Sequence, residues 1–70
     1  MPKVFRIDAS VLPVEDMRQL QSQIDRFTYT VFDDPHIDGV FYAVYEKDTD
    51  FTVPLPSGVT VRSADHEKIL

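Results

Sequence analysis

The side chains best suited to bind or transform a ligand stand together in the run FDDPHIDG, residues 32–39. Asp34, His36 and Asp38 alternate along this run, and Gly39 closes it. Oxygen ligands at alternate positions before a glycine are typical of the opening of a calcium loop. A histidine between carboxylates suits a transition metal, and paired carboxylates can exchange protons with a substrate. The run therefore raises three possibilities: a calcium site, a transition-metal site and an acid–base enzyme.

Both metal possibilities lack ligands. A calcium loop needs a bidentate glutamate at its twelfth position, but the twelfth residue counted from Asp34 is Tyr45, and His36 is a poor ligand for a hard cation. A transition-metal site would have Asp34, His36 and Asp38 as its weak candidates and would have to recruit His66, thirty residues further on. We therefore expect no metal and no other cofactor.

A turn accounts for most of the same run. Aspartate side chains accept hydrogen bonds from nearby backbone N–H groups, Pro35 fixes its own φ, and Gly39 allows a positive φ before the next strand. We therefore interpret residues 33–39 as a connection between two strands. Its carboxylates would then serve as part of an acidic rim around a binding surface.

Other catalytic motifs are absent from the sequence. It has no cysteine, which excludes a thiol nucleophile and a zinc–thiolate site. Its two glycines are too few for a dinucleotide-binding GxGxxG motif or a P-loop, and none of its serines stands in G-x-S-x-G. We therefore predict that the protein is not an enzyme.

The net charge of −5 equals that of the segment from residue 33 to residue 50. This segment has one base and six acids, which are Asp33, Asp34, Asp38, Glu46, Asp48 and Asp50. Clustered Lys and Arg are needed to bind phosphates, so the sequence predicts no direct binding of nucleic acid. A protein partner with a basic surface is the expectation on charge.

Hydrophobic spacing predicts the elements that position these groups. Alternation predicts a strand at 3–8, and β-branched and aromatic residues predict strands at 28–32 and 40–46, joined as an antiparallel hairpin. A helix is expected at 13–26, with an apolar stripe of Val14, Met17, Leu20, Ile24 and Phe27. Shorter strands are indicated at 51–53 and 59–62. The predicted fold is an α+β two-layer sandwich, with one helix packed on a mainly antiparallel sheet of three to five strands.

The strand at 40–46 separates the two acidic loops. A strand of about six residues spans roughly 20 Å, so the loops at 33–38 and 46–50 are expected at opposite ends of it. They cannot form one compact carboxylate site, although they could flank an extended basic surface.

Both faces of the predicted sheet are apolar, and one helix can cover only one of them. Residues 51–62 could cover the second face, or a second chain could pack on it; Pro54 and Pro56 favour the second chain, because they make the segment irregular. Aromatic residues are enriched in interface cores. The predicted partner-binding residues are Phe32, Phe41, Tyr42 and Tyr45, together with the six acids of the segment from 33 to 50.

These observations predict one domain over residues 1–70, with a frayed tail at 63–70. No segment approaches the ~20 apolar residues of a membrane span, and we expect a cytoplasmic protein. We predict a protein-binding module, expected to be a homodimer, that acts as a small acidic regulator or stoichiometric inhibitor of the kind that phages and mobile elements encode, for example against host defence. The alternatives are a metal-dependent or acid–base enzyme built across a dimer around Asp34, His36 and Asp38, and a structural subunit of a larger assembly.

Overall fold

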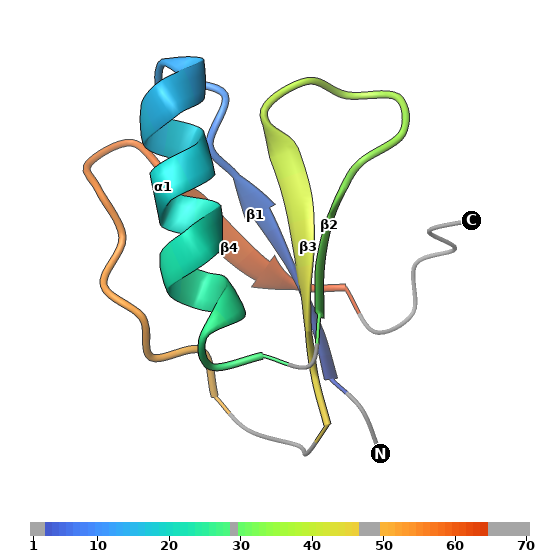
Figure 1. Ribbon diagram of the computed structural model, residues 1–70. Helices are drawn as coiled ribbons and strands as arrows, with labels where there is room; N and C mark the ends of the chain where they lie inside the picture. Colours follow the sequence, from blue (N-terminus) through green and yellow to red (C-terminus); the bar gives the residue numbers. More distant parts are fainter. Residues whose placement is uncertain (1–2, 29, 47–49, 65–70) are drawn as a thin grey trace.

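A computed structural model describes residues 3–28, 30–46 and 50–64 of the protein (Figure 1). The described elements follow in the order β1 (Lys3–Asp8), α1 (Val14–Asp25), β2 (Thr30–Asp33), β3 (Val40–Tyr45) and β4 (Thr60–Ser63). The strands form one open antiparallel sheet in the order β2-β3-β1-β4, and α1 lies on one side of it. The predicted α+β sandwich of one helix on an antiparallel sheet is therefore confirmed.

The alternation predicted for residues 3–8 is visible in β1. Phe5 and Ile7 are buried toward the helix, whereas their neighbours along the strand are only partly buried. The register pairs Ile7 with Phe41 and Phe5 with Ala43, so two central strands supply the sheet's contribution to the main core. Because Asp8 pairs with Val40, the end of β1 lies beside the start of β3.

The helix α1 buries Met17, Leu20 and Ile24, which recur at a spacing of three and four residues. It begins after Pro13 without a side-chain cap, because the proline side chain has no group that can accept a hydrogen bond. Two positions of the predicted apolar stripe are not buried: Val14 and Phe27 are each 67% exposed. Val14 is the first residue of the helix, and Phe27 follows its last residue.

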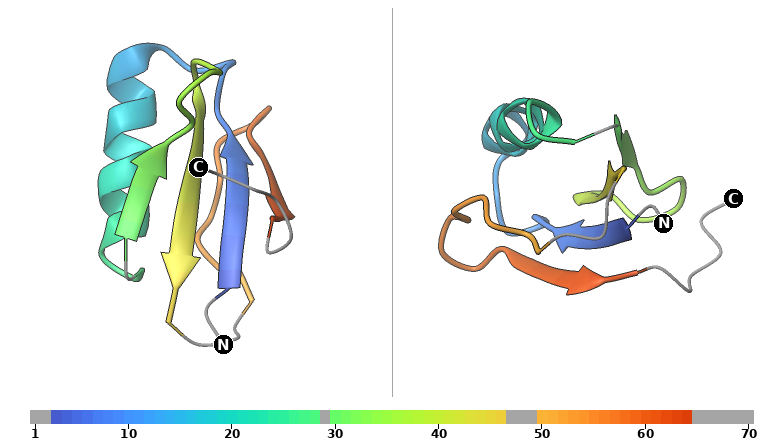
Figure 2. Two further views of the ribbon diagram at one scale, coloured as in Figure 1. Left: turned by 90° about the vertical axis from the view of Figure 1, so that its right-hand side faces the viewer. Right: turned by 90° about the horizontal axis from the view of Figure 1, so that it is seen from below.

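The segment from 50 to 59 packs on the same side of the sheet as α1. Its apolar residues contact the main core at its margin, and they are Phe51, Val53, Leu55 and Val59. The strand predicted at 51–53 does not form, because Pro54 and Pro56 interrupt any ladder. Figure 2 shows this segment and the helix together against one side of the curved sheet. It therefore completes the first core and does not cover the second face.

The second face of the sheet has a small apolar cluster of its own. Val40, Tyr42 and Ala64 are buried there, and Val4 and Phe32 pack against them. The rings of Phe32 and Tyr42 stack with centroids 5.4 Å apart. None of the exposed large hydrophobic residues in the described part of the chain stands in a strand of the sheet. It therefore presents less open apolar surface than the sequence pattern suggests.

The predicted frayed tail is corrected at its first two residues. Ser63 belongs to β4, and Ala64 is buried, with its N–H donating to the carbonyl of Val4 at 2.8 Å. Residues 65–70 lie outside the described part of the chain. In the described residues, no helix has the length and apolar character that crossing a bilayer requires.

Candidate protein-binding surface

Asp34 organises the acidic run as a turn. One of its carboxylate oxygens, Oδ1, accepts the backbone N–H groups of His36 at 2.8 Å and Ile37 at 3.0 Å. The other, Oδ2, accepts the hydroxyl of Tyr42 at 2.7 Å. This pattern is the local aspartate turn that the sequence analysis favoured, with an added tie to β3. Both oxygens of Asp34 are thus engaged within the protein.

The same run does not assemble a metal site in the described residues. Across 3–28, 30–46 and 50–64, no three histidine or acidic side chains are placed to hold one ion together. His66, the further ligand considered from the sequence, lies outside those residues. The side chains of His36 and Asp38 extend from an exposed loop, whereas Asp34 is held in the turn.

Hydrogen bonding lowers the pKa of Asp34 and raises the pKa of Tyr42. The N–H of His36 lowers the pKa of Asp34 most, and the hydroxyl of Tyr42 and the N–H of Ile37 lower it further. The carboxylate in turn raises the pKa of Tyr42, and burial of the ring adds to this effect. The turn is therefore built around a charged carboxylate and a neutral phenol.

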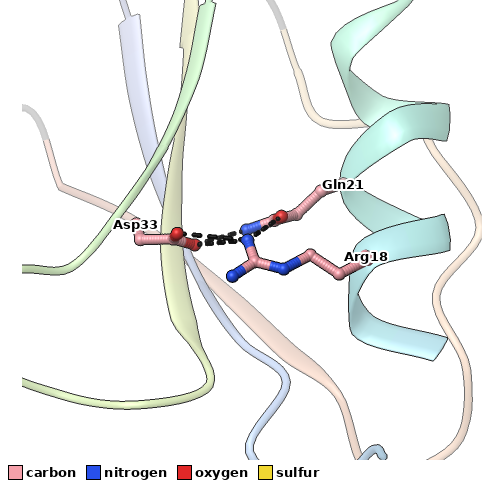
Figure 3. A network of polar contacts seen from close by, with 3 residues as sticks. All are labelled: Arg18, Gln21 and Asp33. Atoms are coloured by element: carbon pink, nitrogen blue, oxygen red, sulfur yellow. Dashed lines mark hydrogen bonds and ion pairs between the residues drawn. The ribbon is translucent and has the colours of Figure 1, made fainter. Parts of the chain in front are cut away.

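Asp33 ties the end of β2 to the helix (Figure 3). Its carboxylate accepts hydrogen bonds from Nε2 of Gln21 at 2.6 Å and from a guanidinium nitrogen of Arg18 at 3.1 Å. Gln21 lowers the pKa of Asp33 most, followed by Arg18. The ion pair is about half exposed on both sides, so it contributes at most about 1 kcal/mol. Its main consequence is to neutralise Arg18 next to the acidic run.

Close backbone contacts hold two loops side by side at this end of the sheet. The N–H of Ala9 donates to the carbonyl of Gly39 at 2.8 Å. Gly39 has a φ of +83°, and a Cβ there would lie 2.6 Å from Cα of Ser10. We use the term loop end for residues 8–18 and 33–39, which Figure 1 shows together at the top of the molecule.

The loop end exposes apolar side chains. Val11 is 63% exposed, Val14 67% and Ile37 48%. The one other large hydrophobic residue exposed to this degree in the described part of the chain is Phe27, which follows the opposite end of the helix. Three of the four exposed large hydrophobic residues of the described chain therefore stand at one end of the molecule, and a concentration of exposed apolar side chains near polar groups is typical of a protein-binding surface.

The loop end also carries a net charge equal to that of the whole chain. One base, Arg18, is opposed there by six acids, which are Asp8, Glu15, Asp16, Asp33, Asp34 and Asp38. The register that pairs Asp8 with Val40 places Asp8 beside the acidic run, and Glu15 and Asp16 stand in the first turn of α1 at the same end of the molecule. The N–H and hydroxyl of Ser10 hold the pKa of Asp8 below its usual value, so this carboxylate is also charged.

The structure places the predicted site residues that it describes in four regions. The acids of the run 33–38 lie at the loop end, whereas Glu46 and Asp50 follow the other end of β3, and Asp48 lies outside the described residues. Phe32 and Tyr42 belong to the cluster on the second face. The remaining two predicted residues, Phe41 and Tyr45, are buried in the main core.

Phe41 and Tyr45 require a correction as partner-binding residues. Phe41 is fully buried and Tyr45 is 9% exposed, and both belong to the core that the helix covers. The ring of Phe5 meets that of Tyr45 edge to face at 5.6 Å. Their side chains are therefore not available to a partner in the folded monomer.

Sequence reasoning missed Val11, Val14 and the contribution of Ile37. Val14 was assigned to the buried stripe of the helix, and Val11 and Ile37 stand in connections, where single apolar residues have no periodic pattern. Val14 and Ile37 each precede an acidic residue in the sequence, whereas Val11 stands between Ser10 and Leu12 and has no such signal. Comparison of the chain with models of protein families, with curated proteins and with solved structures gives no match.

We expect acid to weaken the fold through the turn. A carboxylate whose pKa is lowered on folding stabilises the protein above its unfolded pKa of about 3.9, and this stabilisation is lost as the pH falls through that value toward the folded pKa. Asp34→Asn should therefore lower stability at pH 7 and flatten the decline of the unfolding midpoint between pH 5 and pH 3. Thermal unfolding followed by circular dichroism measures both. An equally steep acid decline in Asp34→Asn would contradict this role.

Proposed function

We propose that this protein is a non-enzymatic binding module, a small acidic regulator or stoichiometric inhibitor, that binds another protein through its loop end. The observation that supports this most directly is the presence of exposed Val11, Val14 and Ile37 at the same end of the molecule as six carboxylates. Its size and acidity fit an inhibitor of the kind encoded by phages and mobile elements, which would act in the cytoplasm.

The two components of the loop end have different roles in this proposal. The exposed apolar side chains would provide affinity, because burying them removes apolar surface from water. The carboxylates would steer the protein toward a basic surface and raise the association rate, with a strong dependence on salt. The partner is therefore a protein with an apolar depression or ridge surrounded by Lys and Arg.

We propose the monomer as the binding unit. The homodimer expected from the sequence depended on an uncovered second face of the sheet. The cluster of Val40, Tyr42 and Ala64 with Val4 and Phe32 reduces the need for another chain there. The enzyme alternative gains no support from the turn, because both oxygens of Asp34 accept internal hydrogen bonds.

The proposal is tested by affinity capture with matched variants. Ile37→Ser and Val11→Ser each remove an exposed apolar side chain at the loop end, and Phe27→Ser removes one at the other end of the helix. A protein from the native host that is retained by the wild type and by Phe27→Ser should be lost from the double variant of Ile37 and Val11. The loss expected from two buried aliphatic contacts is about 10- to 100-fold in affinity.

Two outcomes would oppose the proposal. Retention of the same protein by the double variant, measured with purified components, would place the binding surface elsewhere. Affinity that is unchanged between about 50 mM and 500 mM salt would remove the role of the carboxylates. Circular dichroism of each variant controls for unfolding, and all three changed residues are exposed, so little loss of stability is expected.

A further inference from the structure

Within residues 3–28, 30–46 and 50–64, no strand lies beside the outer edge of β2. β2 is the first strand in the sheet order and pairs only with β3 in the described part of the chain. The pairing register sets Phe32 opposite Tyr42, and Asp34 would follow opposite Val40. The N–H of Asp34 does donate to the carbonyl of Val40, at 2.9 Å, so this pair is hydrogen-bonded.

The phase of the ladder then identifies the outward groups. Hydrogen-bonded and non-hydrogen-bonded pairs alternate in an antiparallel ladder. Since the pair at Asp34 is bonded, the pairs at Phe32 and Thr30 are bonded too, whereas those at Val31 and Asp33 are not. The N–H and C=O groups of Val31 and Asp33 therefore point away from β3, toward the open edge.

The other edge of the sheet is less suited to pairing. β4 follows a segment that contains Pro54 and Pro56, and it carries the exposed charge of Arg62. Arg62 and Ser63 also have further interactions of their own. Natural proteins protect edges with prolines and charges of this kind. β2 has no proline, and its one charged side chain, Asp33, is turned to the helix, where it meets Arg18 and Gln21.

We infer that β2 receives an extended segment of the protein partner as an added antiparallel strand, with basic residues at the segment's N-terminal end. This inference rests on the proposed function and specifies its partner. β2 runs from Thr30 to Asp33 toward the loop end, so an antiparallel strand beside it begins there. Charge complementarity to the acids of the loop end therefore sets which end of the segment is basic.

Two synthetic peptides of opposite direction test the inference. The first is acetyl-Lys-Lys-Lys-Val-Thr-Val-Thr-Val-amide, and the second has the same residues in reverse order. Binding to the isotope-labelled chain is measured by amide chemical shifts in NMR. The first peptide should bind more tightly than its reverse and should shift the amides of Val31 and Asp33 the most.

Backbone N-methylation gives the matched variants. A 70-residue chain can be assembled by chemical synthesis with a methyl group on the amide nitrogen of Val31, which keeps the side chain and blocks one outward donor. The control carries the methyl group on the amide nitrogen of Val61 in β4. Ala64 and Val4 form a hydrogen-bonded pair, so by alternation Val61 is in a non-hydrogen-bonded pair and its N–H also points outward. Val31→Pro, which also lacks the outward N–H, can replace the chain methylated at Val31 when the protein is made by expression. The methyl group on Val31 should weaken the first peptide about fivefold or more, the effect of one lost hydrogen bond.

Each outcome decides the inference. The inference is overturned if both peptides bind with equal affinity, or if the first peptide does not bind at about 1 mM, the order of the weakest affinity of interest. It is also overturned if the methyl group on Val31 leaves the affinity of the first peptide unchanged, or if the methyl group on Val61 lowers that affinity equally. If the captured partner binds the chain methylated at Val31 as tightly as the wild type but is lost on mutation of Ile37 and Val11, the proposed function stands and the strand addition fails. If the partner is lost both on methylation of Val31 and on mutation of Ile37 and Val11, the strand addition and the proposed function are both supported.

Discussion

Replacing Phe41 by alanine is expected to remove about 3–5 kcal/mol from the free energy of unfolding. The side chain is fully buried in the main core, where β3 pairs with β1 and faces the helix. A chain of this length has about 4–10 kcal/mol of stability in total, so the variant should be largely unfolded at 37 °C. Urea unfolding followed by circular dichroism measures the difference.

Phe27→Ala is the matched control for this result. It makes the same chemical change at a residue that is 67% exposed, and it should alter the unfolding free energy by less than about 0.5 kcal/mol. Equal stability of the two variants would contradict the assignment of Phe41 to the core. By the same reasoning Tyr45→Asp should unfold the chain, so any loss of partner binding in this variant would follow from unfolding.

Gly39→Ala is expected to cost about 2–4 kcal/mol, the second largest effect. A positive φ of +83° is unfavourable for alanine, and its Cβ would lie 2.6 Å from a backbone atom of Ser10, which cannot move without displacing β1. The change should also separate the two loops of the loop end, so it should lower partner affinity under conditions where the fold persists.

Gly58→Ala separates the two causes. Its φ of +87° is nearly the same, but the added Cβ would meet a methyl group of Val11 at 3.1 Å, and that exposed side chain can rotate away. The backbone cost of about 1–3 kcal/mol should therefore remain, without the clash. If thermal unfolding shows Gly58→Ala to be as destabilised as Gly39→Ala, the close approach of the loops at Ser10 is not a source of stability.

The elements of the fold could be predicted because each has a strong local pattern. Phe5 and Ile7 alternate with polar residues in β1, and Met17, Leu20 and Ile24 follow the helical period. The side of β3 that the helix covers could not be predicted, because all but one of its residues are buried and both faces are apolar. That choice is made by packing, since Phe41 and Ala43 pair with the inward residues of β1.

The candidate site could be predicted only in part. The turn around Asp34 followed from residue types, because its hydrogen bonds join neighbours in the sequence. The loop end did not, because residues 8–18 and 33–39 are brought to one end of the molecule only by the register of β1 with β3. No local pattern encodes that register, and the same limit applies to the open edge of β2.

The segment after β3 shows a third limit of sequence patterns. Alternation suggested a strand at 51–53, yet Phe51 and Val53 are held against the core by packing alone. The ring of Phe51 lies 5.5 Å from that of Phe5, and aromatic contacts of this kind do not require a ladder. Pro54 then prevents the ladder that the alternation favours.

Amide hydrogen exchange of the chain alone and in complex with the captured partner tests the binding surface most directly. We expect slower exchange in the complex at residues 9–12 and 36–39, with little change at the helix end near Phe27. Protection confined to the second face of the sheet, around Val4 and Val44, would show that the acidic, apolar end of the molecule is not where the partner binds.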